Sequence, residues 1–106
     1  MEYLNKVEFA GVIGTVRKND VADSKVANFS LCVENLFKKN DGTSIIETTW
    51  IQVVAWNGSR IDFESIEKGK NVKVDGRLRT CKYTSSDGNE RCFYEVIAHS
   101  VKVIEN

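Results

Sequence analysis

The chain has 106 residues, of which 42% are hydrophobic and 28% charged, and its 15 lysines and arginines equal its 15 aspartates and glutamates in number. This length suits a single domain with a modest hydrophobic core, which oligomerisation would stabilise further. No apolar run approaches the roughly 18 residues of a membrane span, and the first residues lack the apolar segment of a signal peptide. We therefore expect a soluble, cytoplasmic protein without a membrane partner.

Three cysteines and one histidine limit the chemistry that the chain can perform. Cys32, Cys81 and Cys92 are odd in number and widely spaced, which favours free thiols in a reducing compartment over a disulfide framework. No Cys-x-x-Cys pair offers zinc ligands, and Ser/His or Cys/His catalysis would have to use His99, which stands in a strand-like run. We expect no metal site, no cofactor, no small-molecule substrate and no catalytic residue.

Apolar residues alternate with polar ones along most of the chain, which predicts β-strands. The predicted strands are residues 7–17, 25–34, 45–56, 71–83 and 91–104. Gly11 and Gly14 would let the first strand bend or bulge. Loops are expected to begin at Lys18 and to occupy residues 38–44 and 84–90, the last two around Asp-Gly turn signals.

One segment, residues 59–69, breaks the period of two. Its apolar residues at 61, 63 and 66 fit a short helix, with Ser59 as the N-cap and Gly69 as the C-terminal stop. Five strands with a helix between the third and fourth is the element order of the OB-fold, a five-stranded Greek-key barrel. An SH3-like barrel would lack the helix, and a sandwich would need about two more strands. We predict an all-β OB-fold that forms a single domain over residues 1–106.

Odd- and even-numbered residues of a strand point to opposite faces, which separates a core face from an outward face. In the third strand the aliphatic residues at 51, 53 and 55 form the core face, and Trp50 and Trp56 share the opposite face. In the fourth strand residues 72, 74 and 76 and Leu78 form the core face. The opposite face of that strand carries basic and aromatic residues, namely Lys73, Arg77, Arg79 and Tyr83. A face of this kind can simply be a solvated surface. The exposed tryptophans on a neighbouring strand, however, favour a binding role for this face.

Charge is unevenly distributed along the chain. Residues 68–91 hold seven basic and three acidic side chains, whereas residues 45–67 hold one basic and four acidic ones. The neutral total is therefore a sum of opposed patches. Because cations neutralise phosphates and aromatic rings stack on unpaired bases, this combination indicates a single-stranded nucleic acid as the partner, bound largely without regard to sequence.

Several stretches resemble the bacterial single-stranded DNA-binding protein family. The residues Asn5-Lys6-Val7, followed by Gly11 and Gly14, resemble the opening strand of that family, and residues 26–31, Val-Ala-Asn-Phe-Ser-Leu, resemble its second strand. Residues 49–56, Thr-Trp-Ile-Gln-Val-Val-Ala-Trp, are similar to its third strand. The most distinctive similarity is Lys68-Gly69, then residues 72–83, then Asp87-Gly88. The resemblance covers nearly the whole chain in order.

The resemblance assigns roles to particular residues. It implies base stacking at Trp50, Trp56 and Tyr83, and at Phe37 in the second loop, where the alternative is an aromatic ring folded onto the barrel. It implies phosphate contacts from Lys6, Arg79 and Lys82. Charge and location add further phosphate contacts at Lys38, Lys39, Lys73 and Arg77. For Lys38 and Lys39, simple solvation remains the alternative.

The resemblance also implies a homotetramer of OB-folds with DNA wrapped around it, although a dimer remains open. Ile51 stands where some members have a histidine in subunit contacts, and Cys81 takes a place that is basic in well-known members. The sequence stops at Asn106, whereas the family usually continues through a flexible linker to an acidic tip that recruits other proteins. Without linker and tip, we expect DNA protection but no recruitment by that route.

The leading hypothesis is therefore sequence-nonspecific binding and protection of single-stranded DNA in replication, recombination and repair at the bacterial nucleoid. The alternative is a short primosomal or mobile-element OB-fold protein, dimeric, that acts mainly in protein assembly on DNA. A nuclease is disfavoured because metal-assisted cleavage needs clustered carboxylates beside cations. Here the acids lie mainly in the predicted helix and the turns, away from the basic strand.

Overall fold

The computed structural model describes residues 2–104 and contains five strands and one short 3-10 helix. The elements are β1 (Val7–Val21), β2 (Ser24–Lys38), β3 (Ser44–Trp56), η1 (Phe63–Ser65), β4 (Asn71–Thr84) and β5 (Glu90–Val103). The strands close into a barrel in the order β1-β2-β3-β5-β4, with β1 antiparallel to β4 and a short parallel contact between β3 and β5. The predicted all-β OB-fold is confirmed.

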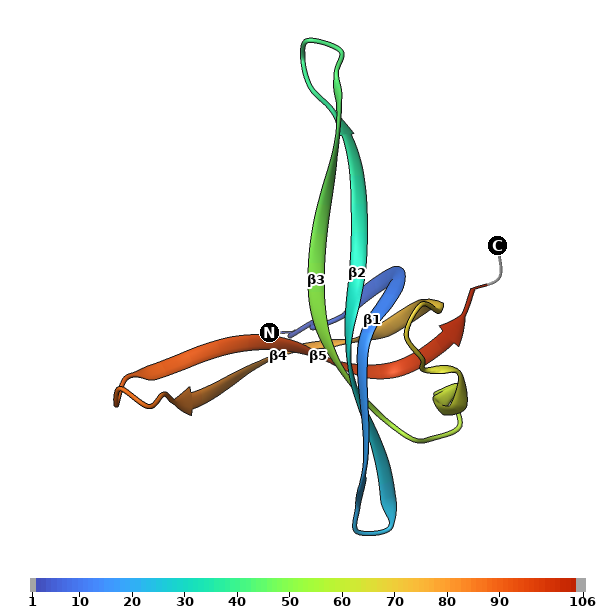
Figure 1. The fold of residues 1–106 in the computed structure, drawn as a ribbon, viewed down its shortest axis with the longest axis vertical. Coiled ribbons are helices and arrows are strands. Elements are labelled where there is room, and N and C mark those ends of the chain that lie inside the picture. Colours follow the sequence, from blue (N-terminus) through green and yellow to red (C-terminus); the bar gives the residue numbers. More distant parts are fainter. Residues whose placement is uncertain (1, 105–106) are drawn as a thin grey trace.

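Three hairpins extend from the barrel as arms, each named here by its two strands (Figure 1). The β2–β3 arm points away from the β1–β2 arm, and the β4–β5 arm leaves the barrel to one side of both. The radius of gyration is 16.1 Å, against about 13 Å for a compact domain of this length. The accessible surface is 7840 Å², against about 6000 Å² for a compact monomer of this mass. The arms therefore leave much surface available to partners.

The core lies inside the barrel and consists of the inward residues of all five strands and of the segment around η1. Phe29, Leu31 and Val53 are among its fully buried side chains. The predicted core face of β3 is confirmed, since Val53 and Ala55 are buried and Ile51 packs against the cluster. Leu78, however, is 41% exposed, which contradicts its predicted place in the core. The pairing of β1 with β4 ends at Val7 and Gly76, so no third strand covers the next inward position.

A β-bulge interrupts the pairing of β1 with β2. Ile13 pairs with Leu31 and Val16 with Phe29, so two residues of β1 stand opposite Ser30. The Thr15 amide, displaced from the ladder, donates to the Ser30 hydroxyl at 2.9 Å, which explains how a polar side chain can be buried here. The extra residue reverses the parity of β1 beyond this point.

The predicted helix at residues 59–69 is only a single turn, and its N-cap is Asp62 rather than Ser59. Ile61 forms a parallel bridge with Val101, while Phe63 and Ile66 are buried in the core. Besides this bridge and the 3-10 turn, the segment consists of turns at both ends and short irregular stretches. Gly69 has a φ of +89°, which fits its predicted role at the end of the segment.

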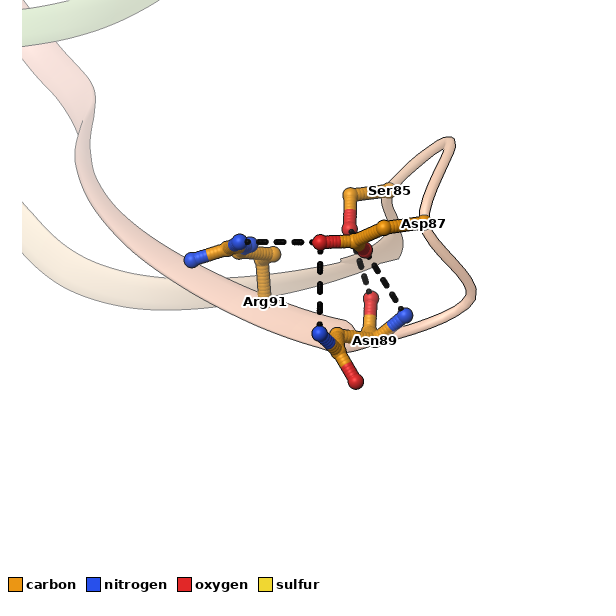
Figure 2. A network of polar contacts seen from close by, with 4 residues as sticks. All are labelled: Ser85, Asp87, Asn89 and Arg91. Carbon is orange, nitrogen blue, oxygen red and sulfur yellow. Dashed lines mark hydrogen bonds and ion pairs between the residues drawn. The ribbon is translucent and has the colours of Figure 1, made fainter.

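Two of the arms end in the same turn, built around an aspartate and a following glycine with positive φ. At the tip of β2–β3 the Asp41 carboxylate accepts hydrogen bonds from the amide and hydroxyl of Thr43, at 2.9 and 2.7 Å. At the tip of β4–β5 the Asp87 carboxylate accepts from Ser85, Asn89 and Arg91 (Figure 2). The Ser85 hydroxyl, followed by the Asn89 amide, holds the pKa of Asp87 below its usual value. Both tips are thus internally braced.

The strands run further into the arms than the sequence indicates. The loop predicted to begin at Lys18 is strand as far as Val21, and the turn is formed at Ala22. Phe37, predicted in the second loop, lies in β2 and pairs with Ile45. Polar residues do not end these strands because the arms are exposed on both faces.

Candidate nucleic-acid interface

The outer face of β3 presents both tryptophans to solvent, with Trp50 59% and Trp56 45% exposed. The register places Trp50 beside Cys32 and Trp56 beside Val26 of β2. The two residues are six positions apart, about 20 Å along a strand, so each ring offers a separate platform. Their shared outward face agrees with the sequence prediction, whereas Val54 between them is buried.

Gly14 forms the seat of the Trp50 ring. A Cβ atom at Gly14 would lie 2.7 Å from Trp50 Cζ3 and 2.7 Å from Ser30 Oγ. Only glycine lets the indole lie this close over the bulge, with the Ser30 hydroxyl held below by Thr15. The bulge therefore determines where Trp50 rests.

We expect Gly14→Ala to displace the Trp50 ring, because this exposed side chain can move, and to disturb the hydrogen bonds between Ser30 and Thr15 at the bulge, because the new Cβ also meets Ser30 Oγ. In a Trp56→Phe background, the emission of the remaining indole should change, and its quenching by single-stranded DNA should weaken. The measurement is steady-state fluorescence, with the free energy of unfolding as control. Unchanged emission and quenching would show that Gly14 does not seat the ring.

A polar hollow of about 270 Å³ lies between the two tryptophan positions, over β1, β2 and β3. Its outward-facing lining includes Thr15, Arg17, Asn28 and Gln52. Arg17 is not among the site residues predicted from the sequence; in the structure it pairs with Asn28 and is exposed. No described residue forms an ion pair with Arg17, so its guanidinium is available to a phosphate running between the two platforms.

A second aromatic surface lies on the β4–β5 arm. The Tyr83 and Phe93 ring centroids are 5.9 Å apart with an interplanar angle of 57°, and the two rings are 50% and 42% exposed. Arg79 lies on the same face of the arm, because it is an even number of residues from Tyr83. Phe93 is not among the site residues predicted from the sequence, although its odd spacing from the buried Val96 is a signal for this outward face.

Glu95 holds Arg79 on this face. Arg79 Nε donates to Glu95 Oε1 at 3.0 Å, the Arg79 Nη2 group donates to the same oxygen, and the Cys81 thiol donates to it at 3.1 Å. Burial raises the pKa of Glu95, but the hydrogen bonds from Arg79 and Cys81 outweigh burial and leave this pKa below its usual value. The hydrogen bond to Glu95, followed by burial, raises the pKa of the Cys81 thiol. The site therefore holds a carboxylate, a guanidinium and a neutral thiol.

Two predicted phosphate contacts, Lys6 and Lys73, lie on another part of the barrel. Lys6 lines an open hollow of about 750 Å³ together with Arg60, His99 and Lys102. Lys73 Nζ lies 3.1 Å from the Glu8 carboxylate, and this contact raises the pKa of Lys73 and lowers that of Glu8. These two cations are thus grouped over β1, β4 and β5 rather than beside the tryptophans.

The remaining predicted residues are divided between the arms. Phe37 lies on the opposite face of the β2–β3 arm from Trp50, since its register position is five residues from that of Cys32. Lys38 and Lys39 are exposed at the end of this arm. On the β4–β5 arm, Lys82 lies on the opposite face from Tyr83, with its Nζ 3.7 Å from Glu90. Arg77 is exposed on the outward face of β4. The predicted residues are therefore spread over the barrel and over the β2–β3 and β4–β5 arms rather than forming one patch.

Other features of the described residues bear on the kind of site. Cys32, Cys81 and Cys92 are free thiols. Over residues 2–104, no three histidine, cysteine, aspartate or glutamate side chains are grouped in a way that would hold a metal ion. None of the described helices has the length and apolar character needed to cross a membrane.

Comparisons with known proteins converge on one family. A family model described as the single-strand binding protein family matches residues 4–104. A single-stranded DNA-binding protein of Xanthomonas axonopodis pv. citri is 31% identical over 95% of the chain and 58% of its own length, and single-stranded DNA-binding protein 2 of Clostridium acetobutylicum is 38% identical over 74% and 57%. The chain thus spans about three fifths of the length of these relatives.

Two solved structures share the fold. An SSB of Plasmodium falciparum, in complex with ssDNA, has a TM-score of 0.81 at 22% identity and covers 99% of the chain and 98% of its own. A small single-stranded DNA-binding protein from Streptomyces coelicolor has a TM-score of 0.72 at 19% identity, with coverage of 98% and 96%. At these identities the likeness concerns the barrel and its arms.

Proposed function

The chain belongs to the single-strand binding protein family, and we propose that it binds and protects single-stranded DNA, largely without regard to sequence, in replication, recombination and repair. The observation that carries the proposal is the outer face of β3, where Trp50 and Trp56 are exposed on either side of a hollow that contains Arg17. Proteins bind a single strand by stacking on its bases and by neutralising its phosphates. This face offers aromatic rings for the first interaction and a guanidinium for the second. Tyr83, Phe93 and Phe37 offer further rings on two arms.

The proposal is tested by titrating the protein with oligo(dT) of about 35 nucleotides and following tryptophan emission. We expect the emission to fall and to recover on addition of salt, with log affinity dropping by about 0.7 per neutralised phosphate per log unit of salt. Duplex DNA of the same length should compete poorly, because its bases are not available for stacking. Emission that stays constant at low salt would contradict the proposal.

We propose a homotetramer as the working assembly. The support is the surface of 7840 Å², larger than a compact monomer of this size exposes, together with the family to which the chain belongs. Light scattering measures this directly. A mass near four times 12.0 kDa supports a tetramer, whereas a mass near twice 12.0 kDa indicates a dimer and favours the assembly role over DNA wrapping.

We propose that the chain binds DNA without catalysing a reaction. We also propose that a single domain performs this binding and that it does so at the bacterial nucleoid. The acidic side chains of the β4–β5 arm support this view, because they pair with cations or brace the turn instead of grouping around a metal position. Incubation with single-stranded DNA and Mg²⁺ should leave the DNA intact.

A further inference from the structure

Three of the seven cations predicted to contact phosphates, Lys73, Arg79 and Lys82, have anionic partners among the described residues. The described residues form four ion pairs, and in every one the basic member comes from the basic segment 68–91. The pairs are Lys73–Glu8, Arg79–Glu95, Lys82–Glu90 and Arg91–Asp87. Because Glu8 and Glu95 lie outside this segment, a count along the chain overstates its free positive charge. Three of the four pairs lie on the β4–β5 arm.

The Arg79–Glu95 pair differs from the others in its burial. The Glu95 side chain is only 11% exposed, compared with 68% for Glu90 and 50% for Asp87. Its Oε1 accepts from the Arg79 guanidinium and from the Cys81 thiol, so it is held from two sides. A carboxylate fixed in this way cannot turn into solvent as the exposed ones can.

Carboxylate and phosphate are equivalent partners for a guanidinium, since both offer anionic oxygens to its N–H groups. A strand stacked on Tyr83 and Phe93 would pass its phosphates beside Arg79, where Glu95 has already cancelled the charge. We propose that the arm's own carboxylates, chiefly Glu95, act as internal competitors of the DNA phosphates and limit the affinity of the β4–β5 arm. This inference rests on the proposed function and adds a residue that sets its strength.

The internal competitor also changes the salt dependence of binding. A free cation that neutralises a phosphate releases a condensed counterion, and this release makes affinity depend on salt. If the phosphate displaces a carboxylate, the carboxylate gains a cation from solution, and the net release falls. If the carboxylate stays in place, Arg79 neutralises no phosphate. In both cases the wild-type salt slope is shallower than the number of basic residues suggests.

The test replaces Glu95 with glutamine, which has the same shape and retains an acceptor for Arg79 and Cys81. We expect Glu95→Gln to bind oligo(dT) about five- to tenfold more tightly at about 50 mM salt, with a slope steeper by about 0.7, as one added phosphate contact predicts. The matched control is Glu67→Gln, which removes one charge from the segment between η1 and β4. Figure 1 shows this segment on the other side of the barrel from the tip of the arm.

Two further variants separate the explanations. The double variant Arg79→Gln/Glu95→Gln removes the pair at constant net charge and should bind within about twofold of wild type; a much larger loss would show that Arg79 contacts phosphate despite Glu95, against the inference. Glu90→Gln changes a side chain that is 68% exposed, so we expect little effect on stability, and it should tighten binding by a smaller factor than Glu95→Gln. If Glu95→Gln lowers the thermal midpoint of unfolding too far for binding measurements, the result for Glu90→Gln tests the competitor role instead.

The outcomes are distinct from those for the proposed function. If wild type fails to bind oligo(dT), the proposed function fails. If wild type binds but Glu95→Gln is no tighter than Glu67→Gln, only the competitor role is overturned. Weaker binding by Glu95→Gln also overturns it and would mean that the carboxylate orients Arg79 toward phosphate.

Discussion

Replacing Trp50 with alanine is expected to cost about 1–3 kcal/mol of binding free energy for oligo(dT), or roughly 5- to 150-fold in affinity. The indole is 59% exposed, and Gly14 fixes where it lies, so a base can stack on it without prior rearrangement. Substitution removes this platform and leaves the neighbouring charges unchanged. Fluorescence anisotropy of a labelled oligonucleotide measures the loss.

The matched comparison is Lys73→Ala. Lys73 is an exposed cation already paired with Glu8 at 3.1 Å, so its removal costs at most one phosphate contact, about fourfold at physiological salt. Trp50→Ala should therefore weaken binding more than Lys73→Ala, and its salt slope should equal that of wild type. A larger effect from Lys73 would mean that phosphate contacts rather than stacking dominate the affinity.

The two tryptophans could be located from sequence because no bulge interrupts the pairing of β3 with β2. Val53 and Ala55 identify the buried face, and this fixes Trp50 and Trp56 on the other. The order of the elements likewise determines the barrel, since five strands with an inserted turn have few ways to close.

Arg17 could not be placed by the same method. Counting by twos from the buried Ile13 puts residue 17 on the core face, but the bulge opposite Ser30 adds one residue and turns Arg17 outward. A bulge depends on the partner strand and on the Ser30 hydroxyl that satisfies the freed amide, so the sequence of one strand does not reveal it.

Which cations form ion pairs also could not be predicted by counting charges along the sequence. Glu95 stands sixteen residues from Arg79, and Glu8 still further from Lys73, yet the antiparallel pairings place each acid beside its base. The segment 68–91 is basic along the chain, but four of its seven cations are paired with a carboxylate in space. The number of unpaired cations is therefore a better guide to phosphate binding by this protein than its net charge.

Replacing Phe29 with alanine is expected to lower the free energy of unfolding by about 3–5 kcal/mol. Phe29 is 1% exposed and stands in the ladder between Val16 of β1 and Val53 of β3, where the barrel wall is covered on both sides. The lost volume cannot be refilled, because neighbouring side chains are fixed on a closed sheet. The total free energy of unfolding of a domain of this size is about 5–15 kcal/mol, so this loss is a large part of its stability.

The matched control is Phe93→Ala, which removes the same side chain from the exposed arm. Phe93 is 42% exposed and contacts Tyr83, so its loss should cost about 1 kcal/mol of stability while weakening DNA binding. Urea unfolding followed by circular dichroism compares the two variants at one protein concentration, because association shifts the apparent stability. Equal destabilisation would mean that the arm belongs to the folded core, whereas a stable Phe93→Ala with reduced affinity places its ring among those that serve the DNA.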